Sequence, residues 1–173
     1  MIKEIYLAGG CYWGTEKYVK SIRGVVKTAV GFANGKTEHP TYKEVCTQNT
    51  DHAETVHVTY DSEQLPLENL LTLFYKIIDP TSVNKQGEDT GRQYRTGIYY
   101  TDEQDKEVIL RSLAQLQEQY QEPVAVECCK LDQFWLAEEY HQNYLDKNPT
   151  GYCHVPWDLI DWVQDVDPLN MEK

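Results

Sequence analysis

A strand pattern that turns directly into a helix pattern opens the chain and limits how it can fold. Residues 3–8 form a short apolar run, which Gly9 and Gly10 end, and Cys11 follows at once. Apolar residues then recur at helical spacing over residues 12–22. A strand and a helix joined by so tight a turn pack against each other, so we expect helices that lie on a sheet.

Strand and helix patterns alternate along the rest of the chain. Strands are predicted over residues 25–32, 55–60, 96–100 and 124–131, and helices over residues 67–78, 102–120, 137–146 and 157–163. A short helix or loop is expected at residues 41–46. The polar residues 81–95 have no periodicity of their own, which is typical of a functional or disordered loop. This order, with one hairpin, predicts a mixed sheet covered by helices in two layers.

The length and the charge of the chain narrow its class and its partners. Its 173 residues suit one domain with one core. A net charge of -12 opposes binding to a phosphate backbone, so nucleic acid is not expected as a partner. No apolar stretch approaches the ~20 residues of a membrane span, and the first residues do not resemble a signal peptide. We therefore expect a cytoplasmic monomer without membrane association.

The five cysteines are odd in number and have no regular spacing, so they do not indicate a disulfide framework. No C-x2-C pair is present, so a zinc site is not expected either. Cys128 and Cys129 are neighbours in a strand pattern and point to opposite faces, so we assign neither a role. Cys46 is also expected to pack rather than to react.

Cys11 lies where the first strand gives way to a helix. The free N–H groups and the positive dipole end of that helix favour a thiolate, and helix N-termini lower a thiol pKa from ~8.5 to ~7 or below. We predict that Cys11 is a nucleophile, although a free cysteine at a strand end can also be a small core residue. Cys153 lies in an irregular segment that could bring a second thiol within disulfide range.

The other candidate residues are weaker signals when each is taken alone. Tyr12 and Trp13 could wall an apolar pocket or simply belong to the core. Glu54 offers a carboxylic acid, although a glutamate at such a position is more often a solvated surface charge. Tyr42 and Tyr94 could line a cleft, or their rings could pack in loops.

Several motifs together resemble the methionine sulfoxide reductase A family. They are Gly10-Cys11-Tyr12-Trp13-Gly14, His39-Pro40-Thr41-Tyr42-Lys43-Glu44-Val45, His52-Ala53-Glu54 with Tyr60-Asp61, Asp79-Pro80-Thr81, residues 86–95, residues 137–142 and Gly151-Tyr152-Cys153. Because they extend over residues 5–153, a chance match of short motifs does not explain them. The resemblance implies an α+β fold: a two-layer α/β sandwich with a mixed sheet, a ferredoxin-like core and an irregular C-terminal segment. It also implies a catalytic domain at residues 1–155 and a tail at residues 156–173 packed on the same domain.

The resemblance implies a role for each candidate residue. Cys11 would be the nucleophile that acts on methionine sulfoxide, and Cys153 would be the resolving thiol. Tyr12 and Trp13 would receive the S-methyl group, Glu54, Tyr42 and Tyr94 would hydrogen-bond the sulfoxide oxygen, and Asp89 would order that site. The substrate would be the S epimer, free or in oxidised proteins. Thioredoxin or a similar dithiol would reduce the resulting disulfide, and no cofactor or metal is implied.

Three departures from the family pattern affect these expectations. Tyr12 stands where phenylalanine is usual, which would add a hydroxyl at the pocket rim. Glu88 replaces an asparagine and residues 32–35 replace a glycine-rich turn, which bears on the geometry near Asp89. No cysteine follows Cys153, so direct reduction of one disulfide is the simpler scheme.

Two other functions fit the same residues. A cysteine hydrolase would pair the thiol with a histidine. A non-catalytic module would use the aromatic side chains to hold methionine.

Overall fold

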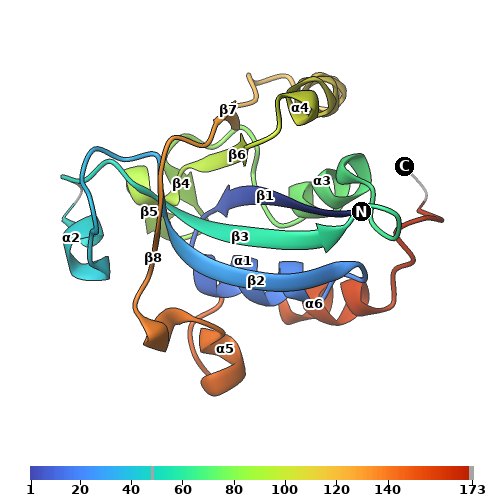
Figure 1. Ribbon diagram of the computed structural model, residues 1–173. Helices are drawn as coiled ribbons and strands as arrows, with labels where there is room; N and C mark the ends of the chain where they lie inside the picture. The colour runs from blue at the N-terminus through green and yellow to red at the C-terminus, as the bar shows by residue number, and fades with distance from the viewer. Residues whose placement is uncertain (48, 172–173) are drawn as a thin grey trace.

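The computed structural model describes residues 1–47 and 49–171, which include a six-stranded sheet (Figure 1). Its strands are β1 (Ile2–Gly9), β2 (Val25–Ala33), β3 (Ala53–Asp61), β6 (Thr96–Tyr100), β7 (Glu127–Lys130) and β8 (Phe134–Leu136). Their order is β7-β6-β1-β3-β2-β8; β6 and β7 are parallel and the other neighbours are antiparallel. The predicted α+β fold with a mixed sheet is confirmed.

The helices differ widely in length. The longer ones are α1 (Tyr12–Lys20), α3 (Leu67–Tyr75), α4 (Glu103–Gln117) and α6 (Trp157–Gln164). The short elements are α2 (Tyr42–Cys46), α5 (Tyr144–Lys147), the 3-10 turns η1 (Arg92–Tyr94) and η2 (Glu139–His141), and the hairpin of β4 (Lys85–Gln86) and β5 (Asp89–Thr90). Figure 1 shows α2, β4 and β5 beyond the end of the sheet where β1 finishes, whereas both chain termini lie at the opposite end.

The two faces of the sheet are covered differently. On β1, Ile5 and Leu7 join the main core with the helices, whereas Tyr6 and Ala8 belong to a smaller cluster on the other face. The segment between β7 and β8 crosses that other face in Figure 1, and the ring of Phe134 lies 5.0 Å from the ring of Tyr6. The alternation of side chains along a strand is the reason that one strand serves both clusters.

The predicted helix over residues 137–146 is wrong. The chain forms η2 and α5 there, and Asn143 between them has a φ of 52°, which a continuous right-handed helix does not allow. Gln142 explains the interruption, because its side chain accepts from the N–H of Val30 and donates to the Val30 carbonyl, both over 2.8 Å. A side chain that binds the edge of β2 in this way replaces a neighbouring strand. The other predicted strands and helices are present, with ends shifted by up to three residues.

The polar residues 81–95 are ordered by their own hydrogen bonds. They contain the β4–β5 hairpin and η1. The buried Gln86 side chain accepts from the N–H of Asp79 over 2.8 Å and donates to its carbonyl over 3.0 Å. These two hydrogen bonds hold the loop against Asp79, which follows α3, so the loop adopts one defined conformation.

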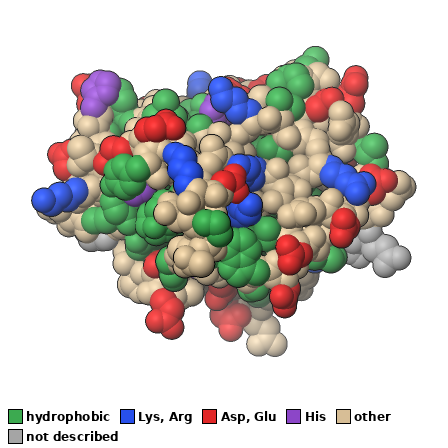
Figure 2. Space-filling model, turned by 90° about the horizontal axis from the view of Figure 1, so that it is seen from below, with side chains coloured by type: hydrophobic (Ala, Val, Ile, Leu, Met, Phe, Trp, Pro, Cys, Tyr) green, Lys and Arg blue, Asp and Glu red, His purple; other side chains and the backbone are tan. Residues whose placement is uncertain are grey.

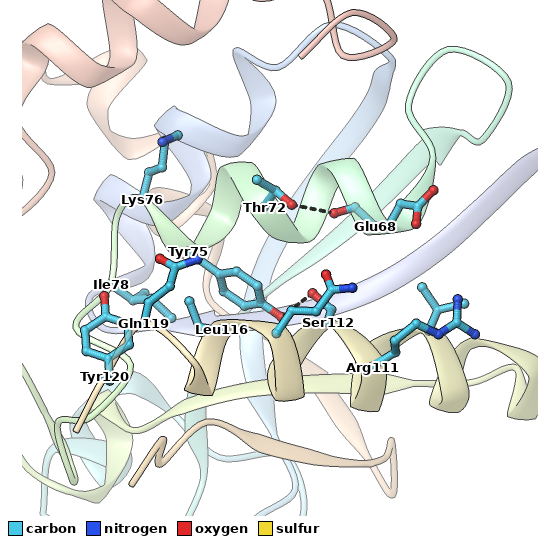
Figure 3. A pocket seen from close by; sticks show the side chains of 12 residues that line it. Glu68, Thr72, Tyr75, Lys76, Ile78, Arg111, Ser112, Leu116, Gln119 and Tyr120 are labelled. Carbon is cyan, nitrogen blue, oxygen red and sulfur yellow. Dashed lines mark hydrogen bonds between the residues drawn. The ribbon is translucent and has the colours of Figure 1, made fainter. Parts of the chain in front are cut away.

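A surface cavity of about 470 Å³ lies between α3 and α4 (Figure 3). Tyr75 and Ser112 extend toward each other across it, and their hydroxyl oxygens are 2.8 Å apart. None of the candidate site residues lines this cavity. Within residues 1–47 and 49–171, no helix combines the length and apolarity that a membrane span needs.

Candidate active site

Two predicted site residues meet where β1 ends and α1 begins. Cys11 occupies the N-cap position of α1, and its side chain is only 6% exposed. Gly10 has a φ of 87°, which glycine adopts without strain, so the chain can turn sharply into the helix. Glu54 lies near the start of β3, where its Oε1 accepts from the backbone N–H of Tyr12 over 3.2 Å. The carboxyl group is thereby held beside the first turn of α1.

Glu54 is 1% exposed, and burial raises its pKa to about 8, with a further contribution from the charge of Asp89. Hydrogen bonds from the Tyr12 N–H and the Gln93 side chain act in the opposite direction. Among the residues that the structure describes, none hydrogen-bonds the second oxygen, Oε2. Near neutral pH this carboxyl group therefore carries a proton that it can give to a bound molecule.

The thiol of Cys11 has a different protonation state from the one expected. Burial raises its pKa well above the ordinary value, and the Glu54 carboxylate adds to the shift. The backbone N–H groups of Trp13 and Gly14 lower the pKa, as a helix N-terminus should. The low pKa predicted from the sequence is wrong, because burial and, after it, the Glu54 carboxylate outweigh the two N–H groups. When Glu54 is protonated, it no longer carries the negative charge that adds to the raised pKa of Cys11.

Aromatic side chains fix the orientation of Trp13. Its ring stacks on the ring of Tyr144 with centroids 3.7 Å apart, and its Nε1 donates to His141 Nδ1 over 3.0 Å. The ring of Tyr42 lies 4.4 Å from that of His141 and 6.5 Å from that of Trp13. An apolar surface of defined orientation therefore lies next to the thiol in sequence and in space.

Tyr12 lies deeper than the sequence suggested. Its side chain is 1% exposed, and its ring packs against Phe32 and His141 with centroids 5.7 and 5.5 Å away. Its hydroxyl is buried and has no hydrogen-bond partner among the described residues. The prediction that this hydroxyl lies at the rim of a pocket is wrong, because the first turn of α1 directs the ring of Tyr12 into the core.

Two phenols come from separate short elements. Tyr42 begins α2, which starts with a capping box between Thr41 and Glu44, and Tyr94 ends η1. Burial raises the pKa of both phenols, and the charge of Glu54 raises both further. Both phenols therefore remain protonated donors at neutral pH, and the charge of Glu54 acts on both.

Asp89 connects the β4–β5 hairpin to the C-terminal segment. Its Oδ2 accepts from the hydroxyl of Tyr152 over 2.9 Å, and burial together with this contact raises the pKa of Tyr152. The negative charge of Asp89 also acts on Cys11 and Glu54. Asp89 therefore lies at the edge of the site, where the hairpin and the segment before Cys153 meet.

Cys153 lies against the first turn of α1. A Cβ atom built on Gly14 would be 3.2 Å from Cys153 Sγ and 2.9 Å from His154 Nδ1. Gly14 is thus the residue that allows this close approach. The Cys153 thiol is half-buried, burial raises its pKa, and its Sγ donates to the carbonyl of Val155 over 3.2 Å. All five cysteines are free thiols.

Three polar residues that received no role from the sequence also contact the site. They are Gln93, which hydrogen-bonds Glu54, His141, which accepts from Trp13, and His154, beside Cys153. Each lies inside or next to a motif that carried the resemblance, and that position is a usable signal. The segments that hold them have no regular period, so the sequence does not tell which polar side chains point inward.

The remaining cysteines lie outside this arrangement or at its rim. Cys46 is exposed at the end of α2, so the prediction that it packs is wrong, although its Sγ lies 3.6 Å from Gln93 Nε2. Cys128 and Cys129 lie in β7, and burial raises the pKa of both. In the described part of the chain, no three His, Cys, Asp or Glu side chains form a group that could hold a metal ion.

The arrangement brings together a thiol, a carboxyl group that keeps its proton near neutral pH, and two phenol donors. Such a set suits a reaction in which a thiol removes an oxygen atom from a substrate, because the departing oxygen needs a proton. The second thiol, against the same helix turn, suits the formation of a disulfide afterwards.

Comparisons with known proteins agree with this chemistry. The family model described as peptide methionine sulfoxide reductase matches residues 3–165. The peptide methionine sulfoxide reductase MsrA of Lachnoclostridium phytofermentans is 61% identical over 155 residues, which cover 90% of this chain and 93% of that protein. The MsrA of Clostridium acetobutylicum is 54% identical, with 92% and 98% covered.

Solved structures give the same result. Reduced Mxr1 from Saccharomyces cerevisiae matches with a TM-score of 0.84 and 39% identity, over 88% of each chain. Mxr1 in complex with Trx2 matches with a TM-score of 0.60 and 26% identity, over 83% of this chain and 84% of that one. The chain therefore belongs to the peptide methionine sulfoxide reductase family, oxidoreductases that return methionine sulfoxide to methionine.

Proposed function

We propose that this chain reduces the S epimer of methionine sulfoxide, free or within oxidised proteins, by a cycle of two thiols. Cys11 attacks the sulfoxide, Glu54 supplies the proton, and Cys153 resolves the product. The observation that carries the proposal is the buried Glu54 carboxyl beside Cys11, with a pKa of about 8 and an Oε2 that no described residue hydrogen-bonds.

In the first step Cys11, whose pKa burial raises, gives up its proton as it takes the oxygen from the substrate. The Glu54 proton moves to the sulfoxide oxygen and the Cys11 proton replaces it on Glu54, while the S–O bond of the substrate breaks and a bond forms between that oxygen and Cys11 Sγ. The substrate sulfur gains two electrons and becomes a thioether, while Cys11 loses two and becomes a sulfenic acid. A positioned acid contributes on the order of 100-fold to 10,000-fold to such a step.

The polar groups supply most of the discrimination between sulfoxide and thioether. Burying one methyl group on Trp13 is worth only ~0.8 kcal/mol, about fourfold in affinity. This contact is the same for both molecules. Glu54, Tyr42 and Tyr94 donate to an oxygen that the product lacks, so these donors are left unpaired when thioether binds. Tyr12 supports this surface from behind, because its ring is buried beneath it.

In the second step Cys153 condenses with the sulfenic acid. An S–S bond forms, the S–O bond of Cys11 breaks, and water leaves. The position of Cys153 against Gly14 supports this step, since Gly14 belongs to the turn that Cys11 caps. A dithiol protein then reduces the disulfide by thiol exchange. The complex of Mxr1 with Trx2 supports thioredoxin as the reductant here.

We further infer that the core has the ferredoxin-like arrangement. The elements β1, α1, β2, β3, α3 and β6 follow one another along the chain, apart from short insertions. Their strands lie in the order β6-β1-β3-β2, with antiparallel neighbours. This order supports two interleaved strand–helix–strand units, which place the start of α1 and of β3 at one end of the sheet.

The cycle is tested with reduced protein and an excess of a methionine sulfoxide peptide, in the absence of any reductant. We expect one methionine per chain and the loss of two of the five free thiols. Cys11→Ser abolishes both, and Cys153→Ser still forms one methionine. Cys128→Ser, in β7, is the matched control and keeps both results unchanged.

Other outcomes assign other functions. Release of an acyl product without loss of thiols indicates a hydrolase. Binding of the sulfoxide without methionine formation indicates a non-catalytic module. Either result would overturn the proposal.

A further inference from the structure

His154 occupies a small space between the end of β1 and the first turn of α1. Its Nε2 lies 3.0 Å from the carbonyl oxygen of Gly9. A Cβ atom on Gly10 would lie 3.2 Å from the same nitrogen, and one on Gly14 would lie 2.9 Å from Nδ1. The ring is therefore held by close contacts on both sides, next to the helix terminus that Cys11 caps.

The hydrogen bond to Gly9 determines which nitrogen carries the proton. A carbonyl oxygen only accepts, so Nε2 must donate and hold the hydrogen. In the neutral ring Nδ1 then has a free lone pair. Nδ1 is buried and no described residue hydrogen-bonds it. Nδ1 is therefore a base to which no described residue gives a proton.

This lone pair lies near the Cys153 thiol. Cys153 Sγ and His154 Nδ1 both lie within 3.2 Å of the point where a Gly14 Cβ would be. The thiol donates to the carbonyl of Val155, so it must turn from that acceptor when it reacts. Because Nδ1 approaches the same residue, Gly14, it is placed to take the proton that the thiol then releases.

We propose that His154 is the general base of the resolving step, which takes the proton of Cys153 as this thiol attacks oxidised Cys11. The inference deepens the proposed function and rests on it. Because Cys153 is half-buried and burial raises its pKa, the thiol needs a base to react near neutral pH.

The proton and the electrons balance within the step. Nδ1 takes the Cys153 proton, and the thiolate forms a bond to Cys11 Sγ. The S–O bond of the sulfenic acid breaks with its electron pair, and the departing hydroxide takes a proton from the imidazolium. Water leaves, the disulfide remains, and His154 returns to its neutral form.

The charges around His154 suit this exchange. Burial lowers the pKa of the ring, which keeps it neutral and able to accept a proton. The carboxylate of Asp89 and the Gly9 carbonyl act in the opposite direction and stabilise the imidazolium once it forms.

His154→Gln is the informative variant, because the glutamine amide can still donate to the Gly9 carbonyl but offers no base. Two rates are followed after mixing reduced protein with a methionine sulfoxide peptide: formation of the first methionine, and loss of the second thiol. We expect the first rate to stay within about twofold and the second to fall about 100-fold, the lower range for a lost general base.

The pH dependence separates a base from a structural residue. Without the base, loss of the second thiol should accelerate about tenfold per pH unit below the Cys153 pKa, because only the thiolate reacts. The wild-type rate should depend less steeply on pH. His57→Gln, a partly exposed histidine on β3 paired with Glu4, is the matched control and should change neither rate.

Each outcome has a distinct meaning. An unchanged second rate with an unchanged pH profile overturns the role of His154. If His154→Gln slows the formation of the first methionine, the substitution has damaged the Cys11 site. Equal slowing of methionine formation and of the loss of the second thiol therefore also counts against a specific base. Failure of the wild-type protein to form methionine overturns the proposed function instead.

Discussion

Glu54 changes its affinity for a proton when the chain folds. Its carboxyl group has an ordinary pKa of 4.5, and burial raises the pKa to about 8 in the fold. Between these values the folded chain holds a proton that the unfolded chain has released. By linkage, the Glu54 carboxyl makes folding less favourable as the pH rises from the unfolded pKa to the folded pKa. Above the folded pKa the whole loss in the free energy of unfolding remains. The sequence identifies the glutamate, but only its burial determines the proton.

The substitution Glu54→Gln should therefore stabilise the fold at high pH while it removes the acid. Glutamine stays neutral, so we expect its melting temperature to approach that of the wild type at pH 5 and to exceed it at pH 8. Thermal unfolding at several pH values checks this. Glu63→Gln, at a side chain that is 85% exposed, is the control and should give no pH-dependent gain. A difference that does not grow with pH would contradict the raised pKa.

The same substitution should slow catalysis. Without a proton to donate, we expect methionine formation to fall by about 100-fold to 10,000-fold. The wild-type rate should in turn decline as pH rises through about 8, where Glu54 loses its proton. Rapid-quench measurement of the first turnover tests both. A wild-type rate that keeps rising well above pH 8 would argue that Glu54 is not the acid.

The segment after β8 illustrates what happens at the scale of an element. Residues 137–146 have a helical spacing of apolar side chains, yet they fold as η2 and α5. The Gln142 side chain binds Val30 through two hydrogen bonds, and these contacts are available only once β2 is part of the sheet. A local pattern cannot predict a competitor that lies more than a hundred residues away in the chain.

Gln142→Ala should therefore destabilise the protein. The variant removes the acceptor of the Val30 N–H, whereas the Val30 carbonyl still accepts from the N–H of Ala137 over 3.1 Å. We expect a loss of about 2 kcal/mol in the free energy of unfolding, the usual cost of a backbone group left without a partner. Urea unfolding measures it. Gln115→Ala, at an exposed position of α4, should change stability much less. Equal effects of the two substitutions would show that the Val30 contacts contribute little.

Gly14 is the contact point between α1 and the C-terminal segment. Alanine in a helix is ordinarily more stable than glycine by ~1 kcal/mol. Here the added Cβ would lie 2.9 Å from His154 Nδ1, so Gly14→Ala should displace Cys153 and His154 instead. We expect loss of the second thiol to slow by up to about 100-fold, as for a misplaced reactive group, with less effect on the first methionine. A normal second rate would contradict this.

The C-terminal residues belong to the core at the scale of the whole molecule. Ile160 and Val163 of α6 are buried in the main core, and Asn69 Nδ2 donates to the Pro168 carbonyl over 2.6 Å. A tail at residues 156–173 that folds with residues 1–155 stays our prediction. Figure 2 shows acidic, basic and apolar side chains interspersed over the face it presents, so on this face the acidic residues behind the net charge of -12 are spread out.

Ile160→Ala tests whether this tail folds with the rest. We expect a loss of about 2–5 kcal/mol, as for other large apolar residues replaced in a core. Circular dichroism and tryptophan fluorescence should report one shared transition, because Trp157 and Trp162 lie in α6. Asp161→Ala, at an exposed position, is the control. Two separate transitions would indicate that the tail is an independent unit.

The sequence by itself determined the order of most strands and helices, though not β8 or the interruption between η2 and α5. It also determined the position of Cys11 at the start of α1 and the set of residues from which a site could be built. These features depend on side-chain periodicity and turn residues, which act between neighbours in the chain. The fixed orientation of Trp13, the protonated state of Glu54 and the meeting of Cys153 with Gly14 were decided only by the tertiary structure. Each of the three depends on burial or on contact between distant segments. Burial and such contacts are not properties of any single stretch of sequence.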